Sequence, residues 1–165
     1  MVILGVDPGL ANTGWGVVDF IGQKFRPVCF GVINTEPKSN LEDRIASIAD
    51  SLGDVVDKYH PQHVSIEDIF FAKNEVSAIG VAKVIGAVSY RMHQLAVPVS
   101  MFTPLQIKIA ITGYGRAEKK QVQEMCRILL GLDRIPRPDH AADALAAAVC
   151  WGNTSSTQGR LGILR

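Results

Sequence analysis

Two acidic side chains stand at positions where carboxylates from distant parts of the chain could meet. Asp7 follows the apolar run Val2–Val6 and opens an Asp-Pro-Gly turn. Glu67 ends a second apolar run, His63–Glu67. Taken singly, Asp7 is typical of a turn and Glu67 of a solvated strand end. If their strands are neighbours, the like charges repel one another unless a cation lies between them.

A histidine and a third acid share one face of a predicted helix near the C-terminal end of the sequence. His140 and Asp143 are three residues apart, so their side chains are expected one turn apart on that face. Asp139 follows a proline and fits the N-cap position. Asp143 can be an exposed surface acid, but it lies among alanines and leucine, where a buried charge needs a partner.

This combination of ligand types favours a hard divalent cation. Carboxylate oxygens with one imidazole, and no cysteine cluster, suit Mg²⁺ or Mn²⁺ better than structural zinc. The cysteines at positions 29, 126 and 150 are too widely spaced for a CxxC metal site or a disulfide scaffold. Two ions about 3.5–4 Å apart can clamp the attacking and leaving oxygens of a phosphodiester. The sequence therefore indicates metal-assisted phosphodiester chemistry.

The elements that must position these residues follow an α/β pattern. Short apolar runs predict five strands, at Val2–Val6, Gly14–Val18, Val28–Ile33, His63–Glu67 and Val97–Phe102. Helical spacing of apolar residues predicts helices over 41–59, 75–95, 122–130 and 139–151. The fold class expected is α/β, with a mixed five-stranded sheet flanked by helices.

The predicted order of the strands brings the two acids together. The first strand is the most uniformly apolar, so we place it at the centre of the sheet. A short connection at 21–24 makes the first three strands an antiparallel meander on one side of it. A right-handed crossover through the first helix then places the fourth strand on its other side. Asp7 and Glu67 would end neighbouring strands.

Composition sets outer limits on the protein. Its 165 residues are 47% hydrophobic with a net charge of +1, which fits one globular domain, expected at 1–151, and a flexible tail at 152–165. No apolar run approaches the roughly 20 residues that span a bilayer, so a cytoplasmic protein is expected. Residues 105–138 hold seven basic and three acidic side chains, a local field that would attract a polyanion.

Four segments, in this order, give the chain a close resemblance to the RuvC family of crossover junction endodeoxyribonucleases. They read Gly5-Val6-Asp7-Pro8-Gly9 with Thr13-Gly14-Trp15-Gly16, then 66–74, 115–122 and 139–146. The resemblance implies a ribonuclease-H-like fold and a homodimer that nicks opposite strands of four-way (Holliday) DNA junctions symmetrically. It further implies 5′-phosphate and 3′-hydroxyl ends, a dependence on Mg²⁺ or substituting Mn²⁺, and cooperation with the branch-migration motor complex of RuvA and RuvB.

The same resemblance assigns the catalytic and metal-binding residues. Asp7, Glu67 and Asp143 match the catalytic acids of the family, and the fourth position falls on His140, where many members have aspartate. The four are expected to hold two Mg²⁺ ions. It stays open whether His140 ligates through a nitrogen or Asp139 shares its role. We favour His140 because we expect it, and not Asp139, to share the helix face of Asp143.

DNA contacts are expected from aromatic and basic side chains near the acids. The resemblance points to an aromatic residue that stacks on an unpaired base, a lysine beside it on a phosphate, and two lysines near the scissile phosphate, where a cation stabilises the transition state. Two further basic residues in or beside a glycine-bearing loop would follow the backbone. The stacking residue is Phe70 and the lysine beside it is Lys73. The lysines near the scissile phosphate are Lys108 and Lys119, and the two further basic residues are Arg116 and Lys120.

Two other functions fit parts of the pattern. A non-catalytic module that binds junctions would need none of the acids for activity. A nucleotide phosphotransferase of the actin and sugar-kinase type also carries an Asp after its first strand and a nearby Thr-Gly. The length of 165 residues argues against the second, because that architecture clamps its nucleotide between two domains.

Overall fold

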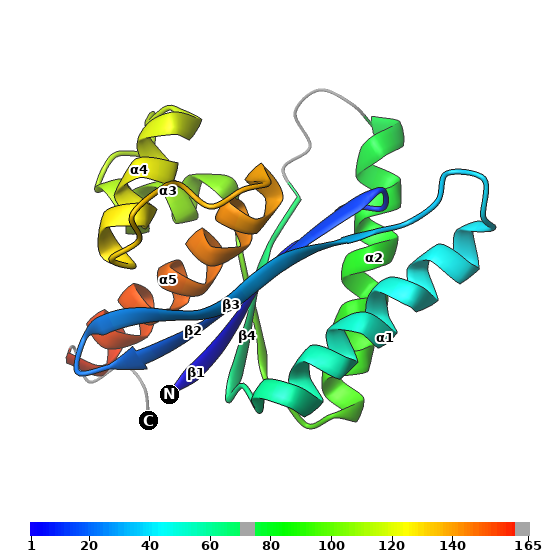
Figure 1. The fold of residues 1–165 in the computed structure, drawn as a ribbon, viewed down its shortest axis with the longest axis horizontal. Coiled ribbons are helices and arrows are strands. Elements are labelled where there is room, and N and C mark those ends of the chain that lie inside the picture. Colours follow the sequence, from blue (N-terminus) through cyan, green and yellow to red (C-terminus); the bar gives the residue numbers. More distant parts are fainter. Residues whose placement is uncertain (70–74, 161–165) are drawn as a thin grey trace.

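A five-stranded sheet in the order β3-β2-β1-β4-β5 forms the centre of the molecule (Figure 1). The computed structural model describes residues 1–69 and 75–160. The strands are β1 (Val2–Asp7), β2 (Asn12–Ile21), β3 (Lys24–Asn34), β4 (His63–Glu67) and β5 (Val99–Phe102). The helices are α1 (Leu41–Tyr59), α2 (Glu75–Gln94), α3 (Pro104–Thr112), α4 (Lys119–Leu129) and α5 (Asp139–Arg160).

The register of the sheet confirms the predicted order of the strands. β1 is central, antiparallel to β2 on one side and parallel to β4 on the other. Val6 pairs with Ile66 across the parallel ladder. Asp7 and Glu67 are the next residues of these two strands, so they leave the sheet side by side at the same edge. β4 in turn pairs in parallel with β5.

Helices cover both faces of the sheet, and each face has its own apolar core. α1 and α2 pack on one face, while α5 lies on the other, with α3 and α4 outside it (Figure 1). The alanines of α5 from 141 to 148 are buried, which lets its backbone approach the strands closely. Ser65 on β4 donates a 2.6 Å hydrogen bond to the carbonyl oxygen of Ala147. In the described ranges, no helix combines the length and hydropathy that a bilayer crossing needs.

α5 continues past the predicted helix end at Trp151 as far as Arg160. The tail predicted at 152–165 is therefore helical up to residue 160, and residues 161–165 lie outside the described part of the chain. Gly152 sits against the ring of Phe25, where an added Cβ would come within 2.4 Å. Hydroxyl groups of the next turn donate to helix carbonyls, including Thr154 to Cys150 at 2.8 Å and Ser156 to Gly152 at 2.9 Å. The close packing of Gly152 on Phe25 favours a continued helix, and the hydroxyl groups find acceptors on the helix itself, although the polar composition predicted fraying.

The sequence analysis missed α3, a nine-residue helix after β5. Its start carries a recognisable signal. Thr103 is the N-cap and Pro104 follows it in the first turn, while the Gln106 side chain accepts from the Thr103 backbone N–H at 2.8 Å. The apolar residues of this helix are too evenly distributed to show an amphipathic pattern. α3 matters for the site because it carries Lys108.

Candidate active site

The turn after β1 fixes the position of Asp7. Thr13, which is fully buried, donates a 2.7 Å hydrogen bond through its hydroxyl to the carbonyl oxygen of Gly9. The same hydroxyl oxygen accepts from the Gly9 backbone N–H at 3.4 Å. The side chain of Asp7 is only 17% exposed, although it lies at the end of its strand. The paired strand β2 and the start of helix α5 lie against it.

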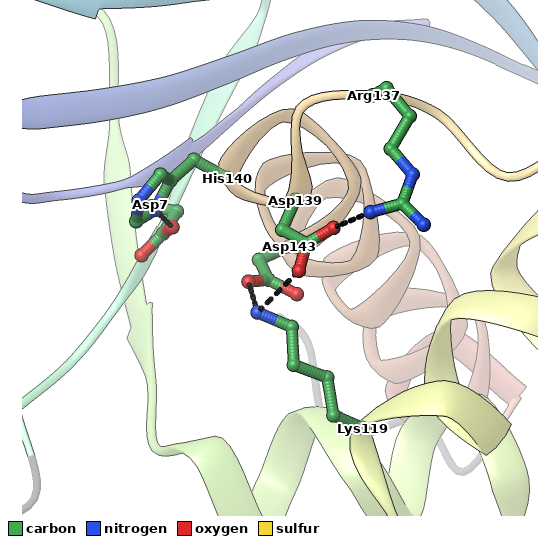
Figure 2. A network of polar contacts seen from close by, with 6 residues as sticks. All are labelled: Asp7, Lys119, Arg137, Asp139, His140 and Asp143. Atoms are coloured by element: carbon green, nitrogen blue, oxygen red, sulfur yellow. Dashed lines mark hydrogen bonds and ion pairs between the residues drawn. The ribbon is translucent and has the colours of Figure 1, made fainter.

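The first two turns of α5 bring the histidine and the third acid to this edge of the sheet (Figure 2). His140 Nδ1 lies 2.7 Å from Asp7 Oδ2. Asp143 faces the other way, toward α4, where its Oδ2 accepts a 2.8 Å hydrogen bond from Lys119 Nζ. Its side chain is 24% exposed. His140 and Asp7 thus meet at the sheet edge, while Asp143 lies on the side that faces α4.

A pocket of about 300 Å³ opens on the Asp143 side, between the end of β4 and the helices α3, α4 and α5. Glu67 and Asp143 supply acidic groups to its wall, and Lys108 of α3 and Lys119 of α4 supply cations. The remaining wall is apolar or small, from Pro104, Ile107, Val122 and Ala146. The pocket thus combines carboxylates with two ammonium groups from different helices, which suits a phosphate group held beside acidic ligands.

The carboxylates influence one another strongly. Burial, together with the negative charges of Asp7 and Asp143, raises the pKa of Glu67 to about 8. Burial also raises the pKa of Asp7, although its hydrogen bond with His140 opposes the rise. Partial burial lowers the pKa of Lys119, but its hydrogen bond to Asp143 and the surrounding acids raise it above its ordinary value overall. Burial therefore disfavours the charged forms of Glu67 and Asp7, and neighbouring carboxylates add to the effect.

The donor set fits a hard divalent cation. Carboxylate oxygens and one imidazole are available at a place where like charges already repel. Among the described side chains, those of residues 1–69 and 78–156, no group of three or more His, Cys, Asp or Glu is arranged to hold a metal ion. Asp7 is instead engaged by His140 and Asp143 by Lys119. Turning these carboxylates toward a shared ion would replace both contacts.

The structure places the predicted DNA-binding residues unequally. Lys108 and Lys119 line the acidic pocket. Arg116 is exposed in the segment between α3 and α4. Lys120 lines a different hollow on the outer side of α4, together with Tyr114 and Met125. Phe70 and Lys73 lie outside the described residues.

Two residues beside the site make contacts that the sequence analysis did not predict. The sequence analysis excluded Asp139 from the helix face of Asp143, yet Asp139 Oδ2 lies 3.7 Å from the same Lys119 Nζ that binds Asp143. Positions four apart on a helix are neighbours as much as positions three apart, and this spacing was the available signal. Arg137 Nη1 donates to Asp139 Oδ1 at 2.8 Å. Nothing in the sequence pattern singled out Arg137.

The high pKa of Glu67 gives the site a measurable proton linkage. In the metal-free protein at pH 7, Glu67 with a pKa of about 8 holds a proton that a metal ligand must lose. Affinity for Mn²⁺ should therefore rise with pH, by at most about tenfold per unit below pH 8, and level off above it. Calorimetry at pH 7 in two buffers of different ionisation enthalpy should show release of about one proton per site.

The variant Glu67→Gln provides the control for this linkage. It removes the titrating group, so the rise in Mn²⁺ affinity between pH 6 and 8 should flatten. An unchanged slope in Glu67→Gln would assign the proton to another group and contradict the pKa given for Glu67.

Comparisons with known proteins agree over nearly the whole chain. The family model described as crossover junction endodeoxyribonuclease RuvC matches residues 3–151. A protein of that name from Desulforamulus reducens is 43% identical over 159 residues, covering 96% of this chain and 98% of its own length. Another, from Treponema denticola, is 46% identical over 147 residues, covering 89% of this chain and 83% of its own.

Solved structures show the same likeness in three dimensions. The structure described as T. thermophilus RuvC in complex with Holliday junction substrate superposes with a TM-score of 0.90 at 35% identity, covering 95% of this chain and 96% of that one. The yeast mitochondrial Holliday junction resolvase Ydc2 superposes with a TM-score of 0.69 at 14% identity, covering 96% and 80%, and shares the fold.

Proposed function

The chain belongs to the RuvC family of crossover junction endodeoxyribonucleases, and we propose that it cuts Holliday junctions where the ends of β1 and β4 meet the start of α5. It is a Holliday junction resolvase with a ribonuclease-H-like fold, and the family is metal-dependent. The observation that carries the choice of site is the 2.7 Å contact between His140 and Asp7, which are 133 positions apart. It joins the end of the central strand to the start of the last helix.

Four side chains form the proposed catalytic and metal-binding set. Asp7 is central, because it lies beside Glu67 through the strand pairing and beside His140 through the hydrogen bond. Asp143 completes the set from the next turn of α5. We assign Mg²⁺ as the ion, with Mn²⁺ as a substitute and two ions per site, since three acids exceed what one divalent charge neutralises. Bound there, the ions would activate a water molecule and stabilise charge on the phosphate.

The reaction is hydrolysis of one phosphodiester in each of two opposite strands. The water oxygen forms a bond to phosphorus in line, the bond to the 3′ oxygen breaks, and that oxygen takes up a proton. The products are a 5′-phosphate and a 3′-hydroxyl. Lys108 and Lys119 line the pocket, so their ammonium groups are placed to stabilise the extra negative charge on the phosphate.

The basic stretch around the pocket supports contacts with the DNA backbone. Arg116 and Lys120 are exposed on the side of the molecule that carries α3 and α4, and we propose that they bind phosphates farther from the cut. Phe70 stays proposed as a stacking residue and Lys73 as a phosphate contact. Because phosphate contacts release counterions, junction binding should weaken as salt rises.

Symmetric cutting requires two sites related by a two-fold axis, so we propose a homodimer. Exposed apolar side chains on α2, at Ile79 and Tyr90, offer a surface for it. The match over residues 3–151 supports a nuclease domain at 1–151. We further propose that the enzyme works in the cytoplasm, where bacterial DNA lies, with the branch-migration motor complex of RuvA and RuvB.

A nicking assay on three DNA substrates tests this function. A four-way junction, a linear duplex and a splayed arm carry the same labelled strand, and Mg²⁺ is titrated over each. Nicks are expected in the junction alone, in opposite strands, and only with metal. Equal cutting of all three substrates would reduce the protein to a general nuclease. Junction binding without nicks at any Mg²⁺ concentration would favour the non-catalytic module.

A further inference from the structure

A chain of ion pairs extends from the acidic pocket across the first turn of α5 to its far side (Figure 2). Lys119 Nζ lies 2.8 Å from Asp143 Oδ2 and 3.7 Å from Asp139 Oδ2. The other carboxylate oxygen of Asp139 accepts a 2.8 Å hydrogen bond from Arg137 Nη1. One ammonium group is thus shared by two carboxylates, and a guanidinium holds the second of them.

Asp139 and His140 lie on different sides of the helix end although they are adjacent in sequence. His140 points to Asp7, whereas Asp139 is directed toward Lys119 and Arg137 (Figure 2). Asp139 is 44% exposed, against 17% for Asp7 and 24% for Asp143. Both of its oxygens already face a cation of the protein. It therefore differs from the three acids proposed as metal ligands.

We propose that Asp139 is a positioning residue for Lys119 and not a metal ligand. The inference rests on the proposed function, in which Asp143 binds metal. A cation at Asp143 weakens the hold of that carboxylate on Lys119, because two positive charges compete for one group. Asp139 is then the neighbouring carboxylate that keeps the ammonium at the pocket wall, where it faces the reacting phosphate. Arg137 keeps the Asp139 carboxylate turned toward this place.

The geometry gives Asp139 two measurable effects. With Asp139→Asn, Lys119 loses the carboxylate that holds it beside the metal-loaded site, so cutting at saturating Mg²⁺ should fall about fivefold, as expected for a partly exposed ion pair. In the metal-free Asp139→Asn variant, Asp143 would be the one carboxylate left to Lys119. Lys119 would therefore compete more strongly with an incoming ion for the Asp143 carboxylate. The Mn²⁺ dissociation constant of the DNA-free protein should therefore rise about threefold.

A double-mutant cycle between Asp139→Asn and Lys119→Met tests the proposal. If Asp139 acts only through Lys119, its replacement changes nothing once Lys119 is gone. The double variant should then match Lys119→Met both in cutting rate and in Mn²⁺ affinity, the latter measured by electron paramagnetic resonance without DNA. Asp139→Glu, which retains the charge, should keep most of the wild-type rate.

Asp133→Asn is the matched control, because it removes the same charge from the segment between α4 and α5 and lies outside this chain of ion pairs. It should leave both measurements unchanged. If Asp139→Asn further slows cutting or raises the Mn²⁺ dissociation constant in the Lys119→Met background, Asp139 binds metal directly and the proposal is wrong. Wild-type protein that makes no nick in the junction would instead overturn the proposed function.

Discussion

Asp7→Asn should lower the rate of junction cutting by at least ~10³-fold, which corresponds to a loss of about 4 kcal/mol of transition-state stabilisation. The change removes the central carboxylate of the proposed metal site and keeps the shape of the side chain. Folding should not suffer, because burial already raises the pKa of Asp7 and the charge is the costly part of that buried group. Junction binding should stay near the wild-type level, since it depends on backbone contacts elsewhere.

Three measurements on this variant separate catalysis from folding. These are nicking of a synthetic junction with Mg²⁺, junction binding by gel shift, and the melting temperature. Asp19→Asn is the matched control, because Asp19 lies beside the opposite end of β1 and forms an ion pair with the exposed N-terminus. It should cut normally. An Asp7→Asn protein that nicks at the wild-type rate would place the chemistry outside the proposed metal site.

Gly14→Ala should damage both stability and activity. Gly14 is the β2 partner of Asp7, and α5 crosses it so closely that an added Cβ would lie 2.0 Å from the carbonyl oxygen of His140. Because the added Cβ would clash with backbone atoms of α5, the helix itself must move. Such overpacking costs about 1–3 kcal/mol. A shift of the first turn of α5 by about 1 Å also separates His140 from Asp7, which can cost ~10² in rate.

Thermal unfolding and nicking of the same samples check this expectation. The loss of stability should lower the melting temperature by roughly 2–12 °C for a chain of this size. Gly80→Ala is the control, since its added Cβ meets only the Leu10 side chain at an ordinary 3.6 Å. In α2 it should be neutral or stabilising by about 1 kcal/mol. A Gly14→Ala protein with wild-type stability and rate would show that the contact between α5 and the sheet is looser than described.

The sheet could be predicted because its determinants are local and periodic. The uniformly apolar β1, the short connection before β3 and the amphipathic α1 each leave a clear pattern, and chain connectivity then forces β4 beside β1. The juxtaposition of Asp7 and Glu67 follows from that order alone. α3 was missed because its apolar residues surround the helix without a preferred face, and only the start signal at Thr103 marked it.

Two contacts of the site could not be predicted, because each depends on how helices pack in three dimensions. The contact of His140 with Asp7 depends on how far α5 slides along β1 and β2, and the clearance at Gly14 sets that distance. The pairing of Asp139 with Lys119 depends on where α4 begins relative to α5. Neither quantity has a periodic trace in the sequence. The spacing of four between Asp139 and Asp143 allowed the contact but did not require it.

The most direct test of the account is to locate Mn²⁺ by anomalous diffraction in crystals of the protein with a bound junction. We expect anomalous peaks in contact with carboxylate oxygens of Asp7, Glu67 and Asp143 and with a nitrogen of His140. Asp139 should remain with Lys119 outside the coordination shell. Peaks ligated by other residues, or no peak between β1, β4 and α5 at saturating Mn²⁺, would contradict it.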